Sequence, residues 1–206
     1  MDDIKVFYID SEKFLPHINN DSLNYFIEEQ SFKSEKRKIQ YALGRFLIKF
    51  VAQKLNIKNS KIVIKNKKPY LEDNELYFSL SHTKNIVLIA CWKNNIGADI
   101  EFMKERNFEK YFERYHIEPN NNNKNTFYEF WTKYEAEIKL QKKGQSFFST
   151  ELIENFMLSI CISENMHIEE NIKIYELLIE KNDNNLINLD NISKNKKLEN
   201  IKLINR

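Results

Sequence analysis

The sequence predicts a mixed α+β protein in which short strands accompany two long helices. Residues 95–102 read N-I-G-A-D-I-E-F, and this strict alternation of apolar and polar residues is the signature of a half-buried strand. Residues 34–55 carry apolar side chains at spacings of three and four, which predicts a long amphipathic helix, and residues 126–142 predict a second one. Because 42% of the 206 residues are hydrophobic and 13% are aromatic, the composition fits a folded protein.

The remaining elements are short. We expect further helices over 21–29 and 108–116, and strands over 4–9, 61–65, 76–81, 86–92, 156–163, 172–180 and 186–189. Asp21 or Ser22 is available as the N-cap of the helix at 21–29. The turn at 93–95 predicts a hairpin between strands 86–92 and 95–102. Pro69 forces a turn or an extended edge, and the Asn-rich stretch 182–206 carries no recognisable chemistry.

Three glycines are expected to mark backbone positions with special demands: Gly44, Gly97 and Gly144. Gly97 leaves room for the close approach of a backbone or a ligand. Gly144 is expected to end the second long helix. The buried stripe of that helix is expected to consist of Phe127, Trp131, Tyr134 and Ile138.

Charge and cysteine content limit the function classes. The chain has 32 basic and 30 acidic residues, and this balance does not favour nucleic-acid binding. Cys91 and Cys161 lie in apolar runs and are expected to be buried hydrophobic residues rather than metal ligands or a disulfide. No signal peptide and no membrane-spanning run is recognisable. We therefore expect a cytoplasmic protein without a membrane or nucleic-acid partner.

The strand at 95–102 brings two carboxylates together. Asp99 and Glu101 are two residues apart, so their side chains point to the same face. Neighbouring carboxylates repel each other, and burying either one without a partner costs free energy. A divalent cation such as Mg²⁺ would resolve both problems, because it binds carboxylates together with phosphate oxygens and water. A solvated polar strand face is the alternative interpretation.

Three other groups of residues are ambiguous on their own. Ser81 and His82 stand at a strand end, where capping or packing is the usual role. Glu135 and Lys139 are four residues apart on the second long helix, which predicts either a surface ion pair or site residues. The start of the first long helix is basic, which indicates a solvated face or a phosphate site; its basic residues are Lys33, Lys36, Arg37, Lys38 and Arg45.

Four motifs in order resemble those of the 4′-phosphopantetheinyl transferases. I-G-A-D-I-E at 96–101 is similar to (V/I)-G-(I/V)-D-(I/V)-E of that family, and F-W-T-K-Y-E-A-E-I-K at 130–139 is similar to W-(S/T)-x-K-E-(A/S)-x-x-K. K-P-Y-L at 68–71 resembles G-K-P-x-(L/I), and S-L-S-H-T at 79–83 resembles (N/S)-(I/L)-S-H-(S/T). The length resembles the monomeric, surfactin-synthetase-activating (Sfp) type.

This resemblance implies a fold and a reaction. The fold would be a pseudo-dimer of two similar α+β lobes, residues 1–94 and 95–206, each a small antiparallel sheet packed with a long helix. The active site would lie in the cleft between them. The reaction would be the Mg²⁺-dependent transfer of 4′-phosphopantetheine from coenzyme A to a serine of an apo acyl or peptidyl carrier protein, as in fatty acid biosynthesis, with release of 3′,5′-ADP. Mn²⁺ is an alternative metal. The acidic carrier protein would dock on basic residues around 33–45 or 139–143.

The resemblance also implies the residues at the metal. Asp99, Glu101 and Glu135 would be its ligands, and Glu135 would also be the base for the serine hydroxyl. A water molecule held by the metal is the alternative base. One departure from the family pattern is Tyr134, which stands where the family has a lysine just before the helix glutamate.

Coenzyme A would be bound by residues from both halves. Lys139 would contact its pyrophosphate, Ser81 and His82 its phosphates, and Lys68 would line the nucleotide pocket. Gln40 stands where the family has an arginine for the 3′-phosphate; the candidates to replace that arginine are Arg37, Lys36 and Arg45.

Two other function classes remain open at this point. The first is a non-catalytic relative that binds coenzyme A or a carrier protein without transfer. The second is a different Mg²⁺-dependent nucleotide or phosphate enzyme that uses the same carboxylates.

Overall fold

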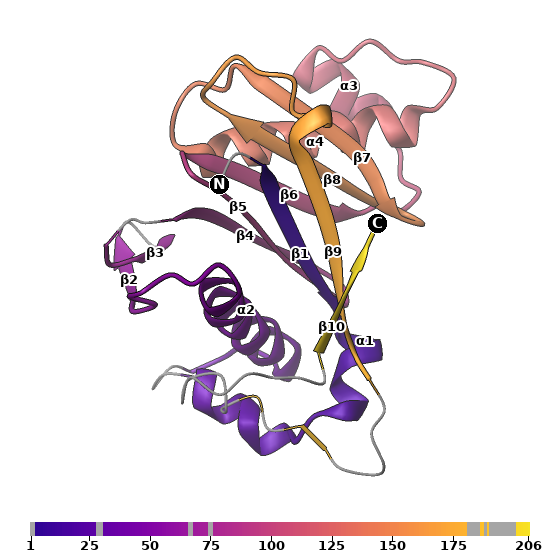
Figure 1. Ribbon diagram of the computed structural model, residues 1–206. Coiled ribbons are helices and arrows are strands. Elements are labelled where there is room, and N and C mark those ends of the chain that lie inside the picture. Colours follow the sequence, from indigo (N-terminus) through magenta and orange to yellow (C-terminus); the bar gives the residue numbers. More distant parts are fainter. Residues whose placement is uncertain are drawn as a thin grey trace.

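The computed structural model describes residues 3–27, 31–65, 68–73, 76–180, 186, 187, 189 and 201–206. The expected α+β class is confirmed (Figure 1). A five-stranded sheet has the order β10-β9-β1-β5-β4, and its strands are β1 (Ile4–Asp10), β4 (Tyr77–Thr83), β5 (Ile86–Trp92), β9 (Ile172–Ile179) and β10 (Ile201–Asn205). A three-stranded sheet has the order β6-β8-β7, formed by β6 (Ile96–Phe102), β7 (Ser146–Ile153) and β8 (Phe156–Ile162). A separate hairpin joins β2 (Ile62–Lys65) to β3 (Lys68–Leu71).

Two long helices cover the outer faces of the two larger sheets. They are α2 (Glu35–Lys54) and α4 (Asn123–Leu140). The shorter helical segments are α1 (Ser11–Phe14), α3 (Glu109–Tyr115) and the 3₁₀ turns η1 (Leu15–His17), η2 (Asn20–Phe26) and η3 (Glu169–Asn171). The layers therefore follow in the order α2, five-stranded sheet, three-stranded sheet, α4 (Figure 1).

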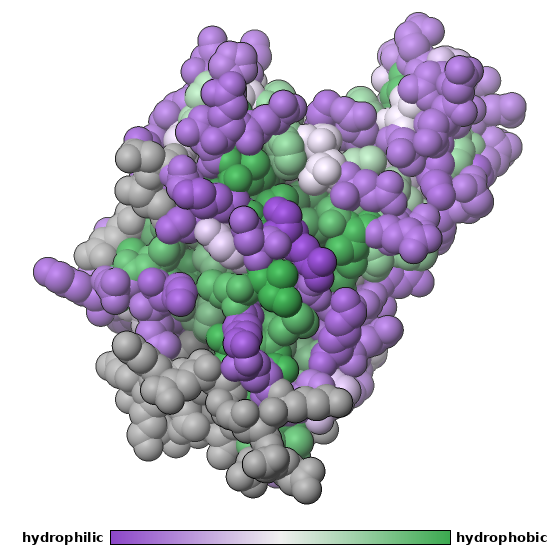
Figure 2. Space-filling model, turned by 45° about the vertical axis from the view of Figure 1, so that its right-hand side comes forward, coloured by the Kyte–Doolittle hydropathy of each residue, from purple (hydrophilic) through white to green (hydrophobic). Residues whose placement is uncertain are grey.

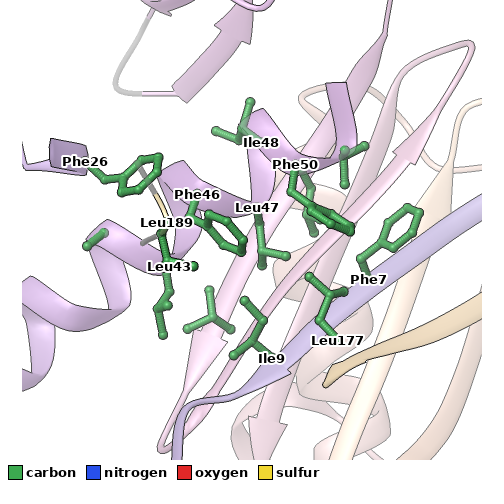
Figure 3. Packing of buried hydrophobic residues seen from close by; sticks show 14 of the residues in the cluster. Phe7, Ile9, Phe26, Leu43, Phe46, Leu47, Ile48, Phe50, Leu177 and Leu189 are labelled. Carbon is green, nitrogen blue, oxygen red and sulfur yellow. The ribbon is translucent and has the colours of Figure 1, made fainter. Parts of the chain in front are cut away.

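Most residues of β1 are apolar, because both faces of this strand are covered. Phe7 and Ile9 pack against α2, where Phe46 and Leu47 belong to the same buried cluster (Figure 3). Val6 and Tyr8 point to the opposite face and pack against the three-stranded sheet. Both faces of β1 are thus covered, so neither set of side chains meets water.

The two halves of the chain share one order of connections. β1 leads through α2 to the hairpin β4–β5, and β5 lies between β1 and β4. In the same way β6 leads through α4 to the hairpin β7–β8, and β8 lies between β6 and β7. The expected boundary after residue 94 falls between these two units. The last two strands nevertheless belong to the sheet of the first unit. β9 pairs with β1 in parallel and β10 pairs with β9, so residues from the C-terminal part complete the first sheet.

Most predicted elements are confirmed to within a few residues, but the predicted pairing of β5 with β6 is wrong. Both edges of β5 are occupied, by β1 and β4, so β6 pairs with β8 in the other sheet. The segment at 21–29 forms a 3₁₀ turn up to Phe26, and Asn19 caps it instead of Asp21 or Ser22; residues 28–30 lie outside the described part. In the predicted strand at 186–189, Ile187 forms an isolated bridge to Ile18, and residue 188 is not described.

The predicted buried stripe of α4 is wrong in its second half: Phe127 is buried and Trp131 packs partly buried against the same cluster, but the other two residues are not buried. Tyr134 and Ile138 are 44% and 52% exposed. The buried residues of the helix are Phe127, Tyr128, Thr132, Ala136 and Leu140. Ala136 is small where it faces the sheet, because the helix backbone comes very close to it at Gly97, where an added Cβ would lie 1.9 Å from the Ala136 carbonyl oxygen. This close approach confirms the expectation for Gly97.

The other two glycines differ from expectation. Of the atoms in the described residues, a Cβ on Gly44 would meet only Leu80 Cδ1, at an ordinary 3.7 Å. Gln141, not Gly144, takes the left-handed conformation that ends α4, with φ of 60°. A Cβ on Gly144 would lie 2.3 Å from Cys161 Sγ, so tight packing explains this glycine.

Cys91 and Cys161 are free and buried, as expected, and burial raises the pKa of each thiol to about 12. On the surface, apolar side chains gather in the middle of one face and are surrounded by hydrophilic ones (Figure 2). Within the described ranges, no helix has both the length and the apolarity needed to cross a membrane.

Candidate active site

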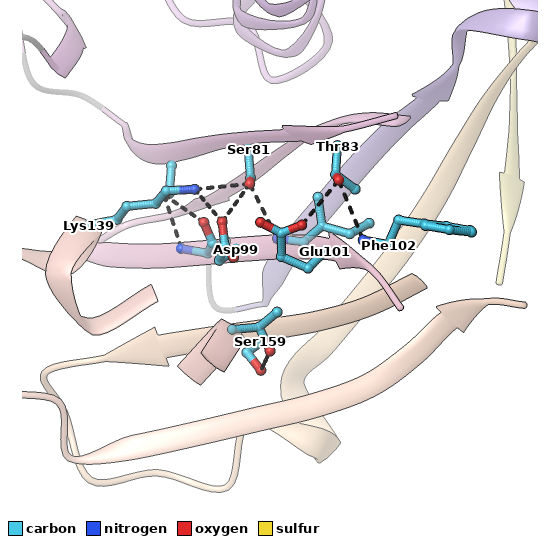
Figure 4. A network of polar contacts seen from close by, with 11 residues as sticks. Ser81, Thr83, Asp99, Glu101, Phe102, Lys139 and Ser159 are labelled. Carbon is cyan, nitrogen blue, oxygen red and sulfur yellow. Dashed lines mark hydrogen bonds and ion pairs between the residues drawn. The ribbon is translucent and has the colours of Figure 1, made fainter. Parts of the chain in front are cut away.

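Strand β4 lies beside β6 at the junction of the two larger sheets, and hydroxyl groups join the two strands (Figure 4). Ser79, Ser81 and Thr83 are spaced by two residues, so they share one face of β4. Ser79 Oγ accepts a hydrogen bond from the backbone N–H of Ala98 at 3.0 Å. Ser81 Oγ and Thr83 Oγ1 accept from the N–H groups of the residues at 100 and 102, at 3.2 and 3.4 Å. Hydroxyl groups of β4 thus accept the hydrogen bonds of the β6 backbone N–H groups that face this strand.

The same hydroxyls hold the two predicted carboxylates. Ser81 donates to Asp99 Oδ1 at 2.8 Å, and Thr83 donates to Glu101 Oε2 at 3.2 Å. The prediction that Asp99 and Glu101 share one strand face is therefore confirmed. Asp99 is only 5% exposed, whereas Glu101 is half-buried. Thr83 was not singled out from the sequence, although the period of two from Ser79 to Thr83 was a signal for it.

Lys139 reaches this pair from α4. Its Nζ lies 2.6 Å from Asp99 Oδ1 and 2.9 Å from Ser81 Oγ. The surface ion pair with Glu135, considered from the spacing on the helix, is not formed, because Lys139 pairs with Asp99 instead. Glu135 lies one turn earlier on α4 and is half-buried. The structure thus joins residues of β4, β6 and α4 that are up to 58 residues apart in the chain.

The chemistry around Asp99 and Glu101 fits a divalent cation. Asp99 Oδ2 is buried and has no hydrogen-bond partner among the residues that the structure describes, although a buried carboxylate oxygen normally has one. Burial, and then the charge of Asp99, raise the pKa of the Glu101 carboxyl above its ordinary value. A cation would satisfy the first group and favour ionisation of the second, and oxygen donors suit Mg²⁺. No cluster of three or more acidic, His or Cys side chains suited to a metal ion occurs within the described part of the chain, so Glu135 is not gathered with the other two.

A cavity of about 460 Å³ adjoins this site at β4. Leu80 and His82 line it from β4, and Arg37, Tyr41 and Arg45 line it from α2. The predicted phosphate-binding residues Arg37, Arg45, Ser81 and His82 therefore meet at one cavity. His82 is exposed, but partial desolvation by the cavity walls, and then the charges of Lys139 and Arg37, lower the pKa of its imidazole below the ordinary value.

Lys68 is the first residue of β3 and contacts the C-terminal end of α4. The next residue, Pro69, lines the cavity. Lys68 Nζ donates to the carbonyl oxygen of Lys139 at 2.7 Å, and Tyr70 donates to Gln141 Oε1 at 3.1 Å. Burial, followed by the charge of Lys139, lowers the pKa of Lys68. In this structure strand β3 therefore braces the end of the helix that carries Lys139.

The two departures from the family pattern have structural roles. Gln40 Nε2 donates to the carbonyl oxygen of Lys84 at 2.9 Å and so holds the turn between β4 and β5. Tyr134 packs against the aromatic rings of Tyr115, Phe130 and Trp131. It lies five residues before Lys139, roughly 140° around the helix from it. Neither Gln40 nor Tyr134 thus takes over the role of the family's positively charged residue at the phosphates.

Comparison with known proteins supports the resemblance that these motifs indicate. No family model matches the chain. A protein named 4′-phosphopantetheinyl transferase gsp, from Aneurinibacillus migulanus, is 29% identical over 140 residues, which cover 62% of this chain and 57% of that protein. The chain thus spans little more than half the length of this relative. The match nevertheless confirms the resemblance to the 4′-phosphopantetheinyl transferase superfamily, of the surfactin-synthetase-activating type.

Proposed function

We propose that this protein transfers 4′-phosphopantetheine from coenzyme A to a serine of an apo carrier protein and releases 3′,5′-ADP. The observation that carries the proposal is the buried Asp99 carboxylate. One of its oxygens has no partner in the described part of the chain, Glu101 lies beside it on β6, and the Lys139 ammonium contacts it. The name of the relative supports the same transfer.

The cavity beside β4 offers the groups that the nucleotide end of coenzyme A requires. Arg37, Arg45 and His82 would receive its phosphates, because guanidinium and imidazolium groups donate charge-assisted hydrogen bonds to phosphate oxygens. Tyr41 and Phe32, which also line the cavity, provide aromatic surface for a base. Lys139, next to Asp99, would meet the pyrophosphate.

Asp99 and Glu101 would hold the Mg²⁺ or Mn²⁺ ion, and Glu135 is proposed as a further ligand. When bound, the ion would gather phosphate oxygens and offset the negative charge that develops on 3′,5′-ADP. Lys139 would add a second positive charge on the same side, and Lys68 would keep the end of α4 in place.

The transfer is a displacement at the phosphorus atom next to pantetheine. The serine oxygen of the carrier protein forms a bond to this phosphorus, and the bond to the bridging oxygen breaks, so that 3′,5′-ADP leaves with the electron pair. The serine proton passes to a base, and the carboxylate of Glu135 is proposed for this task. Its position on α4, one turn before Lys139, supports the assignment.

The finer features that the resemblance implies belong to the same proposal. The shared connection order of β1-α2-β4-β5 and β6-α4-β7-β8 supports a pseudo-dimer with its site between the two units. We expect a cytoplasmic monomer, and an acidic carrier protein that docks on the basic residues near the start of α2 or after Lys139. Raising the salt concentration would then weaken docking, because exposed charges are screened.

The test is the intact mass of an apo acyl carrier protein after incubation with this protein, coenzyme A and Mg²⁺. We expect a gain of one phosphopantetheine arm that EDTA prevents. Glu135→Gln should slow the transfer by about 100-fold or more, the usual contribution of a general base. Asp99→Asn should abolish the dependence on metal together with most of the activity.

Other outcomes would identify the alternatives. Binding of coenzyme A without transfer to several carrier proteins would indicate a non-catalytic binder. Release of nucleotide or phosphate without any carrier protein would indicate a different Mg²⁺-dependent enzyme. Wild-type rates for Asp99→Asn and Glu135→Gln would contradict the assignment of the site.

A further inference from the structure

Thr83 is the last residue of β4 and connects two parts of β6 (Figure 4). Its Oγ1 donates to Glu101 Oε2 at 3.2 Å and accepts from the N–H of Phe102 at 3.4 Å. We propose that Thr83 is a positioning residue, which holds the Glu101 carboxylate beside Asp99 in the orientation that binds the divalent cation. This inference rests on the cation site of the proposed function.

The directions of the two hydrogen bonds follow from the chemistry of the groups. A hydroxyl has one proton to donate and two lone pairs that accept. A backbone N–H can only donate, so a lone pair of Thr83 Oγ1 accepts the hydrogen bond from Phe102. The hydroxyl proton of Thr83 is then available to donate to Glu101. Because threonine is β-branched, its χ1 angle is restricted, and the hydroxyl is held in place before any ligand arrives. Glu101 has a longer and more flexible side chain, so it gains order from this partner.

The neighbouring hydroxyl shows the same arrangement one repeat earlier. Ser81 donates to Asp99 and accepts from the N–H of Ile100, so each carboxylate of the pair has its own hydroxyl on β4. Asp99 is also held by Lys139, whereas the described contacts give Glu101 no ion pair. The orientation of Glu101 therefore depends more strongly on Thr83 than that of Asp99 depends on any one partner.

Ser79 provides a matched control on the same strand. Its hydroxyl accepts from the N–H of Ala98 and donates to the carbonyl oxygen of the same residue at 3.4 Å. Among the contacts of the described residues, Ser79 has none to a carboxylate. Replacing Ser79 with alanine thus removes a bond between β4 and β6 comparable to the one that Thr83 makes, but leaves the cation ligands untouched.

The experiment is a titration with Mn²⁺ in the presence of coenzyme A, in which the free ion is measured by electron paramagnetic resonance. Thr83→Val should weaken Mn²⁺ binding by about 10- to 100-fold, the range found for groups that orient metal ligands. Thr83→Ser keeps the hydroxyl and should restore binding, and Ser79→Ala should bind like the parent. Thermal unfolding shows whether the valine variant folds. If it does not, Thr83→Ala removes the same hydroxyl.

Each outcome supports or overturns the inference. Equal Mn²⁺ affinity of Thr83→Val and the parent overturns it, and so does a parent that binds no Mn²⁺. A loss in Ser79→Ala as large as that in Thr83→Val would assign the effect to the strand rather than to Glu101. The transfer assay separates this result from the proposed function. A parent that binds Mn²⁺ through Thr83 but transfers nothing contradicts the function and leaves the positioning role standing.

Discussion

At the level of single residues, Asp99 lowers the stability of the fold and offers an oxygen to the proposed cation. Its Oδ1 accepts from both Lys139 and Ser81, while its buried Oδ2 has no hydrogen-bond partner within the described ranges. An unsatisfied buried acceptor costs about 1–3 kcal/mol of stability. Natural proteins keep few such groups, and this one supports the cation site that we propose at Asp99.

His82 allows a prediction about pH at the same scale. Desolvation and the charges of Lys139 and Arg37 lower the pKa of His82, so the imidazole is mainly neutral in the free protein near pH 7. A bound phosphate favours the protonated form, so binding takes up a proton. The affinity for coenzyme A should therefore rise as the pH falls from about 8 to about 6.

The measurement is calorimetric titration of the parent and of His82→Gln over this range. The phosphate of coenzyme A titrates in both experiments, so only the difference between the two proteins reports on His82. The variant should show the smaller slope. Identical slopes would mean that His82 does not contact the phosphates.

At the scale of elements, the contact between α4 and β6 places the site. The Cα of Gly97 faces the backbone of α4, and the Asp99 carboxylate two residues later thereby lies within reach of Lys139. A larger residue at position 97 would separate the helix from the strand. The spacing of Lys139 from Asp99 thus depends on a residue that takes no part in the chemistry.

We expect Gly97→Ala to destabilise the protein by at least about 1–3 kcal/mol, the usual cost of overpacking, because the nearest atoms belong to a helix backbone. Gly44→Ala is the control. It lies inside α2 with only an ordinary contact for the new methyl group, and should stabilise by about 0.5–1 kcal/mol. Urea unfolding of the three proteins measures both effects. A stabilised Gly97→Ala variant would show that the helix can move away without cost.

At the scale of the whole molecule, the first sheet is completed by strands from the end of the described chain. Glu176 of β9 is 1% exposed and accepts hydrogen bonds from Tyr8, Lys13 and Arg206. Burial by itself would raise the pKa of Glu176, but the bond from Arg206 and the charge of Lys13 outweigh it, so the pKa is lowered. Burial and then Glu176 raise the pKa of Tyr8 to about 12, so Tyr8 remains a donor. This cluster ties β1, β9 and the residue after β10 together.

Removal of the Arg206 guanidinium should weaken this connection. Arg206→Met should cost about 1–3 kcal/mol at neutral pH, the range for a buried acceptor that loses a charged partner. Because the pKa of Glu176 is lowered in the folded parent, its contribution to stability is present above the unfolded pKa and is lost as the pH falls through the folded value. In the variant this loss should begin at a higher pH, since less opposes the effect of burial.

Lys202→Met serves as the control on β10, because Lys202 pairs with Glu180 in an exposed ion pair that is worth less than about 1 kcal/mol. Urea unfolding at neutral pH and at several acidic pH values measures the three proteins. Equal stability of Arg206→Met and Lys202→Met throughout would contradict a structural role for the buried cluster.

Local patterns were enough to predict most strands and both long helices, because the spacing of apolar residues reflects which faces are buried. They also predicted that Asp99 and Glu101 share a face, since a strand alternates with a period of two. Three expectations failed for a common reason. The partner of β5, the buried face of α4 and the role of Gly44 all depend on which other element comes near.

The α+β class, the residue types at the candidate site and the resemblance to phosphopantetheinyl transferases could therefore be predicted from the residues alone. The pairing of Lys139 with Asp99 rather than with Glu135, and the hydrogen bonds from Ser81 and Thr83 to the carboxylates, became known only from the packed fold. These contacts join β4, β6 and α4 across long stretches of chain. Their geometry is set by the packing of sheets and helix, whereas the spacing of residues within one segment describes only the faces of that segment.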